Sequence, residues 1–278
     1  MAALPRSQAP SKPPVITLLT DFGLADVYVG VMKGVITSIC PGAPVIDLTH
    51  QISPQNIAMG SFQLGNAYAH FPQNTIHVGV VDPGVGSDRQ AVAVQTQSCT
   101  LVGPNNGLFS HILMKEEAIL TVELTNSQYW SLDRPSNTFH GRDIFAPVAA
   151  YLAKGIPLQN LGTILPSSIL ITLPDIDFWQ PTQQGGVGKI QAIDYFGNLI
   201  TNIPAIRVQN HSWHLVVDQH PIHSSTAYHS SEENPDVQAL VGSHGWLEIA
   251  LPNGNAHQAL NMNIGDRVEL QLHGQSID

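Results

Sequence analysis

The hydrophobic pattern between residues 15 and 82 predicts three strands. The first is a continuous apolar run rich in β-branched residues that stops at the turn-forming Asp21-Phe22-Gly23, as a buried strand does. The three runs are Val15–Thr20, Val45–Thr49 and Thr75–Asp82.

Two helices are predicted between these strands. The first carries an apolar residue at every fourth position, which predicts one buried helical face, and Pro41-Gly42 ends it. The residues of this face are Val27, Val31, Val35 and Ile39. The second helix covers Ile57–Phe71 and stops before Pro72. The alternation of strands and helices predicts a largely parallel sheet flanked by helices on both faces.

A change of composition between Pro174 and Gly186 divides the chain. Before it, residues 91–125 continue the strand pattern, and residues 143–154 form a third helical segment with Gly155 at its C-terminal cap. After it, only short strand-like runs occur (GKIQAID, WHLVVD, WLEIAL and RVELQL), which predicts an all-β, barrel-like domain. We therefore expect a flexible tail (residues 1–14), an N-terminal α/β domain (15–178) and a C-terminal β domain (185–278).

Composition narrows the class of protein. Of the 278 residues, 43% are hydrophobic and 12% charged, enough apolar residues for a folded core. With a net charge of −10, the chain lacks the excess of basic residues that is typical of a nucleic-acid-binding protein. No apolar stretch resembles a signal peptide or a membrane span, so neither a membrane nor a secreted setting is expected. The two cysteines, Cys40 and Cys99, exclude a disulfide framework and favour a cytoplasmic location.

Carboxylates near strand ends are the first candidates for chemistry, because ligands of open α/β sheets bind there. Asp21 follows the first strand, Asp47 lies in the second, and Asp82 ends the third. Asp21 and Asp82 are each followed within two residues by glycine, which allows close approach of a ligand, although turn and capping roles are the common alternative. The glycine loop after Asp82 could fold back to pair it with Arg89, as an active-site pair or an ordinary surface ion pair.

The stretch Asn137–Asp143 contains the second group of candidates. His140 could act as a general base or orient one, and Asp143 could cap the helix that follows. Most of the 13 histidines are expected to be loop or strand-surface residues, among them His211, His214, His220, His223 and His229. Neither a metal-ligand motif nor a nucleotide or esterase motif is present, so we predict no metal site.

Five ordered motifs resemble one known family. They are TDFG (20–23), VVDPGVG (80–86) with Arg89, GPNNGL (103–108), TFHGRDIFAP (138–147) and IDYFGNLITNI (193–203). Together they are similar to the S-adenosyl-L-methionine hydroxide adenosyltransferases, which are relatives of the bacterial fluorinase and chlorinase. The resemblance implies attack of water on C5′ of S-adenosyl-L-methionine (SAM), which releases adenosine and L-methionine without a cofactor. It also implies a homotrimer with active sites between subunits.

The resemblance assigns the catalytic set to Asp82, Arg89 and His140. Asp82 is expected to hold the water and draw its proton. Arg89 is expected to hold that carboxylate or to lower the pKa of the water. His140 is expected to complete the hydrogen-bond set and relay the proton, and the choice of base stays open.

The resemblance also implies substrate contacts. Asp21 matches the position that binds the ribose diol, and Phe139 matches a substrate-binding position. Asp26 and Asp194 match positions near the methionine ammonium. Asn198 matches a position near adenine.

Two departures from the halogenating relatives bear on the reaction. These relatives have Tyr at the position of Asp82, and a carboxylate there repels a halide, which favours water as the nucleophile. Glu248 stands where the fluorinase meets the methionine carboxylate, and it is a poor neighbour for that group. The alternatives are a halide adenosyltransferase and a non-catalytic sensor of adenosine or SAM.

Overall fold

The computed structural model of the protein describes residues 12–174, 178–226 and 236–273. The chain divides into two compact units, Met1–Ile176 and Asp177–Asp278. The predicted tail (residues 1–14) lies outside the described residues except for positions 12–14. Within the described residues, no helix has both the length and the apolar character needed to cross a bilayer.

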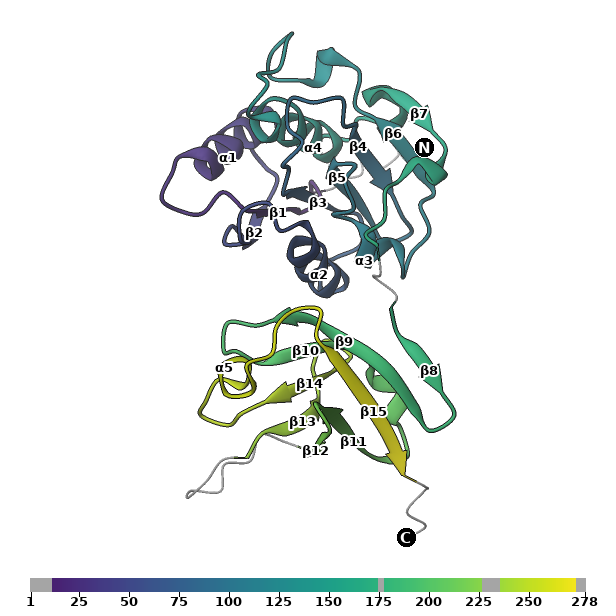
Figure 1. The fold of residues 1–278 in the computed structure, drawn as a ribbon. Coiled ribbons are helices and arrows are strands. Elements are labelled where there is room, and N and C mark those ends of the chain that lie inside the picture. Colours follow the sequence, from purple (N-terminus) through teal and green to yellow (C-terminus); the bar gives the residue numbers. More distant parts are fainter. Residues whose placement is uncertain (1–11, 175–177, 227–235, 274–278) are drawn as a thin grey trace, which may run out of the picture. The chain divides into compact units, whose positions relative to one another are not determined.

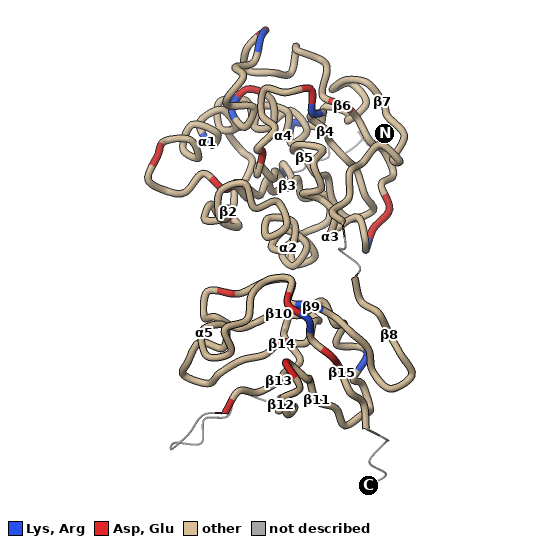
Figure 2. The backbone as a smooth tube through the Cα atoms, viewed as in Figure 1, with Lys and Arg blue, Asp and Glu red and all other residues tan. Residues whose placement is uncertain are grey.

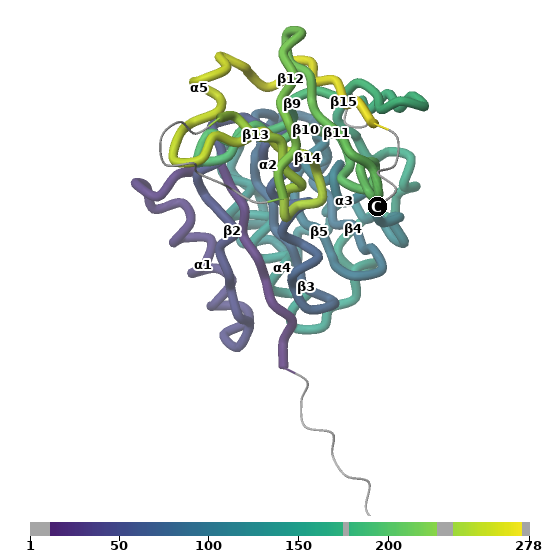
Figure 3. Tube along the Cα trace, turned by 90° about the horizontal axis from the view of Figure 1, so that it is seen from below, coloured from purple at the N-terminus to yellow at the C-terminus, as the bar shows by residue number. Residues whose placement is uncertain are grey.

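Unit 1 is built on a seven-stranded sheet whose order is β2-β1-β3-β5-β4-β6-β7 (Figure 1). Seen from below, β2, β3, β5 and β4 follow one another across the unit (Figure 3). The strands are β1 (Ile16–Thr20), β2 (Val45–Thr49), β3 (Thr75–Val80), β4 (Ala91–Gln95), β5 (Cys99–Pro104), β6 (Leu120–Glu123) and β7 (Thr163–Leu165). The helices are α1 (Tyr28–Ile39), α2 (Ile57–Ala67), α3 (Ser110–Leu113), the π-helix η3 (Gly141–Phe145) and α4 (Ala146–Ala153). Short 3₁₀ turns are η1 (Tyr68–His70), η2 (Ser127–Tyr129), η4 (Leu158–Leu161) and η5 (Ser167–Ile169).

The fold prediction for this unit is confirmed as an α/β sheet with helices, and the sheet is mixed. Strands β2, β1, β3 and β5 are parallel, whereas β4 is antiparallel to β5 and β6, and β6 to β7. Only residues 96–98 join β4 to β5. A parallel pair needs a crossover of a dozen or more residues, so this connection requires a hairpin.

Two hydrophobic layers cover the two faces of this sheet. Ile16 and Leu18 of β1 pack with α1 and α4, while Leu19 packs on the opposite face with α2 and α3, as the alternation of side chains along a strand requires. The predicted buried face of α1 is partly wrong. Its buried residues are Val29, Met32 and Ile36, whereas Val27 precedes the helix and is 73% exposed. The other three predicted positions lie at the margin of the core.

Unit 2 is an antiparallel, nearly closed barrel-like sheet, which confirms the predicted all-β class. Its order is β12-β11-β15-β9-β10-β14-β13, and β8 pairs with β9. A bridge between Ser224 and Ala239 connects the two ends of this order. The strands are β8 (Gln180–Thr182), β9 (Gly185–Ile193), β10 (Leu199–Pro204), β11 (Ser212–Val217), β12 (His220–His223), β13 (Gln238–Val241), β14 (Trp246–Ala250) and β15 (Arg267–His273). The remaining elements are η6 (Ala205–Val208) and α5 (Ala256–Leu260). Figure 2 shows the charged residues of both units along the same trace.

Candidate active site

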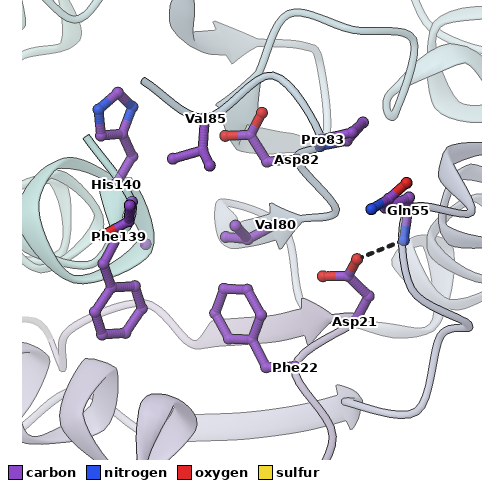
Figure 4. A pocket seen from close by; sticks show the side chains of 11 residues that line it. Asp21, Phe22, Gln55, Val80, Asp82, Pro83, Val85, Phe139 and His140 are labelled. Atoms are coloured by element: carbon purple, nitrogen blue, oxygen red, sulfur yellow. Dashed lines mark hydrogen bonds between the residues drawn. The ribbon is translucent and has the colours of Figure 1, made fainter. Parts of the chain in front are cut away.

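Two of the predicted carboxylates share one cavity at the carboxyl edge of the parallel strands. Asp21 directly follows β1, and Asp82 comes two residues after β3, which pairs with β1 in parallel. Figure 4 shows both carboxylates, the imidazole of His140 and the rings of Phe22 and Phe139 around this cavity of about 240 Å³. Asp47 does not line it; its carboxylate lies 2.6 Å from Lys33 Nζ in a half-exposed ion pair.

Asp82 and Arg89 form a buried ion pair. Arg89 Nε donates to Asp82 Oδ1 at 2.9 Å, and Arg89 Nη2 donates to Oδ2 at 2.5 Å. The side chains of Asp82 and Arg89 are 4% and 10% exposed, so the surface ion pair considered as the alternative is wrong. Two such N–H bonds from a planar guanidinium fix the orientation of the carboxylate as well as its charge.

Glycine makes this pairing possible. Gly86 has φ of +78°, and a Cβ placed on it would lie 2.2 Å from the carbonyl oxygen of Asn137. Only a residue without a side chain lets the loop after Asp82 turn this way and touch the Asn137 backbone. The loop that carries Arg89 is thereby packed against the loop that leads to His140.

His140 extends the pair into a chain of three. Its Nδ1 lies 2.7 Å from Arg89 Nη2. Because a guanidinium has no acceptor, Nδ1 must accept this bond, which leaves the proton of the neutral imidazole on Nε2. Burial lowers the pKa of His140, the charge of Arg89 lowers it further, and the charges of Asp82 and Asp143 only partly oppose this. The imidazole is therefore neutral at pH 7, with an N–H available as a donor.

Asp21 is oriented by a residue that the sequence analysis missed. The backbone N–H of Gln55 donates to Asp21 Oδ2 at 2.8 Å, drawn as a dashed line in Figure 4. Gln55 has φ of +66°, a conformation that non-glycine residues seldom adopt, and it lines the cavity. One carboxylate oxygen of Asp21 is thus held by the backbone.

Aromatic rings form one wall of the site. Phe139 makes edge contacts with Phe22 at 5.8 Å and with Tyr28 at 5.1 Å between ring centroids. The guanidinium of Arg142 lies 5.2 Å from the Phe139 ring. Neither Phe22 nor Tyr28 was singled out from the sequence, although Phe22 lies inside the TDFG motif.

The structure does not show the helix-capping role that was considered for Asp143. It lies inside the π-helix η3 and is fully buried, and its carboxylate accepts bonds from Ser136 and Arg142. A cap would leave it at the exposed start of a helix. Here it ties two segments of chain together.

Three further predicted residues lie outside the cavity described above. Asp26 is exposed in the segment between β1 and α1. Asp194 and Asn198 belong to unit 2, in the turn between β9 and β10. There, Asp194 Oδ1 accepts from the backbone N–H of Asn198 at 2.9 Å, and Oδ2 accepts from its side-chain amide at 2.8 Å. The backbone N–H of Asp194 donates to the Asn198 carbonyl at 3.1 Å, and together these bonds shape the turn.

Glu248, the second departure noted in the sequence, lies on β14 and is 6% exposed. Its carboxylate lies 3.0 Å from His244 Nε2.

Four of the histidines expected on loops and strand surfaces, His211, His214, His220 and His223, lie there, exposed or partly exposed. His214 Nδ1 lies 2.7 Å from His273 Nε2 across neighbouring strands, and His223 stands beside this pair. His229 lies outside the described residues. Across the described ranges, no three His, Cys, Asp or Glu side chains are arranged to hold a metal ion. Cys40 and Cys99 are buried free thiols.

Comparison with known families accounts for both units. Residues 16–162 match the N-terminal domain and residues 188–269 the C-terminal domain of the SAM hydroxide adenosyltransferases. The chain belongs to this family.

Relatives of the SAM hydroxide adenosyltransferase family span nearly the whole chain. The (R)-S-adenosyl-L-methionine hydrolase of Salinispora tropica is 36% identical over 92% of this chain and 97% of its own. The enzyme of that name from Thermus thermophilus is 35% identical over 92% and 98%. A fluorinase of Actinoplanes sp. is 29% identical over 68% and 72%. The crystal structure of an uncharacterized conserved protein from Thermotoga maritima matches with a TM-score of 0.85 and 34% identity, over 92% of this chain and all of that one.

Proposed function

We propose that this protein hydrolyses S-adenosyl-L-methionine to adenosine and L-methionine by attack of water on C5′. The observation that carries the proposal is the buried chain Asp82–Arg89–His140 at the edge of a cavity. Membership of the family and the hydrolase names of its relatives support the same reaction. No cofactor is needed, because the sulfonium is already a good leaving group and the protein has only to position and deprotonate water.

Each of the three side chains has a distinct role in this reaction. Asp82 accepts a proton from the water, and Arg89 holds the carboxylate so that its free lone pairs face the cavity. His140 donates its Nε2–H to the water oxygen and so aims a lone pair at C5′. As the oxygen–carbon bond forms, the carbon–sulfur bond breaks, its electron pair passes to sulfur, and the proton of the water goes to Asp82.

Asp82 also argues against the alternatives. A buried carboxylate at the position of the nucleophile repels chloride or fluoride, so a halide adenosyltransferase is disfavoured. A sensor that only binds the nucleoside needs a pocket but no proton acceptor. Burying a charged pair to 4% and 10% exposure carries a desolvation cost that simple binding does not require.

Substrate recognition is proposed to use both units. Asp21 Oδ1 accepts from the ribose hydroxyls while Gln55 holds the other oxygen, and Phe139 packs against the nucleoside. Asp26 and Asp194 lie near the methionine ammonium, and Asn198 contacts adenine.

We further propose that these groups come together in a homotrimer with sites between subunits. Tyr195 and Phe196, which follow Asp194, are 98% and 72% exposed, which suits a surface that another chain covers. The cavity of about 240 Å³ in unit 1 is smaller than the roughly 300–1,000 Å³ of small-molecule sites, and a second chain would complete it. Mass photometry tests this assembly: a trimer is expected, and an active monomer would overturn it.

The names of the relatives specify the (R) epimer of the sulfonium, and we propose the same preference here. A pyramidal sulfonium carries three different arms, so a pocket that aligns C5′ with water positions the methionyl arm for one epimer only. The two epimers, supplied separately, are expected to differ in kcat/KM. A cytoplasmic location is proposed from the two free thiols.

Product analysis in labelled water tests the function. Protein is incubated with SAM and chloride in H₂¹⁸O, and the products are separated by chromatography and weighed by mass spectrometry. We expect adenosine with one ¹⁸O at its 5′-hydroxyl and unlabelled methionine. 5′-Chloro-5′-deoxyadenosine would indicate the halide reaction, and intact SAM with measurable binding would indicate the sensor.

A further inference from the structure

A fully buried carboxylate follows the proposed catalytic histidine by three residues, and its charge acts on the pKa of that histidine. Asp143 is 0% exposed, and its two oxygens accept four hydrogen bonds. Arg142 Nε donates to Oδ1 at 2.6 Å and Nη2 to Oδ2 at 3.0 Å, while the backbone N–H and hydroxyl of Ser136 donate to Oδ2 at 2.8 and 2.7 Å. Burial raises the pKa of Asp143, but the bonds from Arg142 and Ser136 outweigh this and keep it ionised.

These bonds hold the loop that carries His140 at both of its ends. The Ser136 hydroxyl, besides donating to Asp143, accepts from the backbone N–H of Phe139 at 3.1 Å. At the other end of the loop, the Ser131 backbone N–H donates to the carbonyl of Asp143 at 2.9 Å, and its hydroxyl donates to the carbonyl of Arg142 at 3.0 Å. Ser131 and Ser136 of the loop formed by residues 131–139 are therefore both hydrogen-bonded to the segment Arg142-Asp143, which holds the loop in place.

The π-helix η3 places Asp143 where it bonds the loop and lets the preceding His140 line the cavity. The N–H groups of Arg142 and Asp143 both donate to the carbonyl of Phe139, and the N–H of Ala146 reaches back to the carbonyl of Gly141. One residue is thereby inserted into the helical path, as π-turns at functional sites do. His140 lines the cavity while Asp143 lies in the interior, and Phe145 supports the guanidinium of Arg89 at 5.3 Å from its ring centroid.

We propose that Asp143 is a positioning residue that sets the hydrogen bond between His140 and Arg89. It acts by fixing Ser136 and therefore the loop that leads to His140, and it touches neither substrate nor water. The inference rests on the proposed function. Phe139 also packs against Phe22 and Tyr28, so the wall for the nucleoside has support independent of Asp143. Loss of this anchor should accordingly affect the attack of water more than the binding of SAM.

Two substitutions and a matched control test this role in the full-length protein. Asp143→Asn keeps an acceptor for Ser136 but faces Arg142 with an amide donor, and Arg142 is exposed enough for water to solvate it. Ser136→Ala removes the hydroxyl and leaves the ion pair intact. Asp133→Asn makes the same charge change at an exposed position of the same loop.

We expect Asp143→Asn and Ser136→Ala each to lower kcat per folded enzyme by about 10- to 100-fold, since small misplacements of reacting groups cost this much. KM should stay within about threefold. The double variant should be no slower than the slower single one, because both act on one contact network. Ser136→Thr, which keeps the hydroxyl, should restore most of the rate, and Asp133→Asn should match the wild type.

The outcomes separate this inference from the proposed function. If wild-type protein does not hydrolyse SAM, the proposed function fails. If it does, and both variants match Asp133→Asn in kcat, Asp143 has no positioning role. If KM rises in step with the loss of rate, the loop serves substrate binding instead. Should Asp143→Asn not fold, Ser136→Ala alone decides.

Discussion

The substitution Asp82→Asn tests two roles of the Asp82–Arg89 pair, proton acceptance in the reaction and stabilisation of the fold. It keeps the size of the side chain and removes both the negative charge and the ability to take a proton. If Asp82 is the proton acceptor, kcat should fall by about 10²- to 10⁴-fold, the range for a positioned general base, which is about 3–5 kcal/mol in the barrier. Binding of adenosine should change little, because Asp21 and Phe139 make the proposed nucleoside contacts.

The same substitution should lower the free energy of unfolding. At an effective dielectric constant of about 20, unit charges 2.9 Å apart attract each other by about 6 kcal/mol, and desolvation offsets part of this. Removing one partner of a buried pair costs about 3–5 kcal/mol, because the other charge stays buried without compensation. Arg89, at 10% exposure, would be left in that state.

Glu269→Gln is the matched control for burial. Its carboxylate lies 2.9 Å from Arg267 Nη2, as Asp82 Oδ1 does from Arg89 Nε, but the two side chains are 41% and 67% exposed. An exposed pair contributes about 0–1 kcal/mol, so this variant should keep both its stability and its kcat. Adenosine release is followed by chromatography, stability by urea unfolding and binding by calorimetry with adenosine. A folded Asp82→Asn protein with kcat within about threefold of wild type would refute the role of Asp82, since a positioned general base contributes far more.

Three further predictions concern protonation and metals. Protonation of His140 at Nδ1 would displace the hydrogen bond from Arg89. We therefore expect kcat/KM to be constant above pH 7 and to fall as the pH drops through a pKa below 6.5. A fall of kcat/KM centred above pH 7 would contradict this. Burial lowers the pKa of His77 to about 4, so the folded protein holds this imidazole neutral where the unfolded chain would protonate it. The free energy of unfolding should therefore be highest above pH 6.5 and decrease by about 3 kcal/mol as the pH falls to about 4. Urea unfolding between pH 4 and 7 measures this slope, which His77→Gln should remove. Dialysis against EDTA should leave activity unchanged, because the proposed steps use only protein side chains, and recovery that depends on added zinc would contradict them.

Strands β1 and β3 could be predicted from the sequence because burial on both faces gives each of them a nearly continuous apolar run. Strand β2 lies at the edge of the sheet and is partly exposed, with Ile46 42% exposed. The helix α1 was harder. Apolar residues fall on more than one face of this helix. A spacing of four residues drifts away from the 3.6-residue helical turn, and the face that packs against the core carries Val29, Met32 and Ile36 instead. In unit 2, β12 and β13 have four residues each, and β12 contains Pro221. Strands this short and irregular do not show an alternating hydrophobic pattern in the sequence.

The candidate site was predictable where its contacts are local. Asp82 and Arg89 are seven residues apart with glycines between them, and that spacing suggested that they could pair, although it did not show that the pair is buried. His140 lies 51 residues beyond Arg89, and only resemblance placed it there. Gln55 gave no signal at all, because its role depends on a backbone angle and a donated N–H rather than on its side chain.

The direction of the hydrogen bonds decides a point that residue types left open. In a serine–histidine–aspartate triad the imidazole stands in the middle and carries the proton. Here the guanidinium stands in the middle, with a carboxylate on one side and Nδ1 of His140 on the other. Arginine donates to both and does not give up a proton in proteins, so no proton passes between His140 and Asp82 through Arg89. A relay by His140 is therefore excluded along this path. Because His140 accepts from Arg89 at Nδ1 and carries its proton on Nε2, it has no free nitrogen to take a proton from the water, and we propose Asp82 as the base.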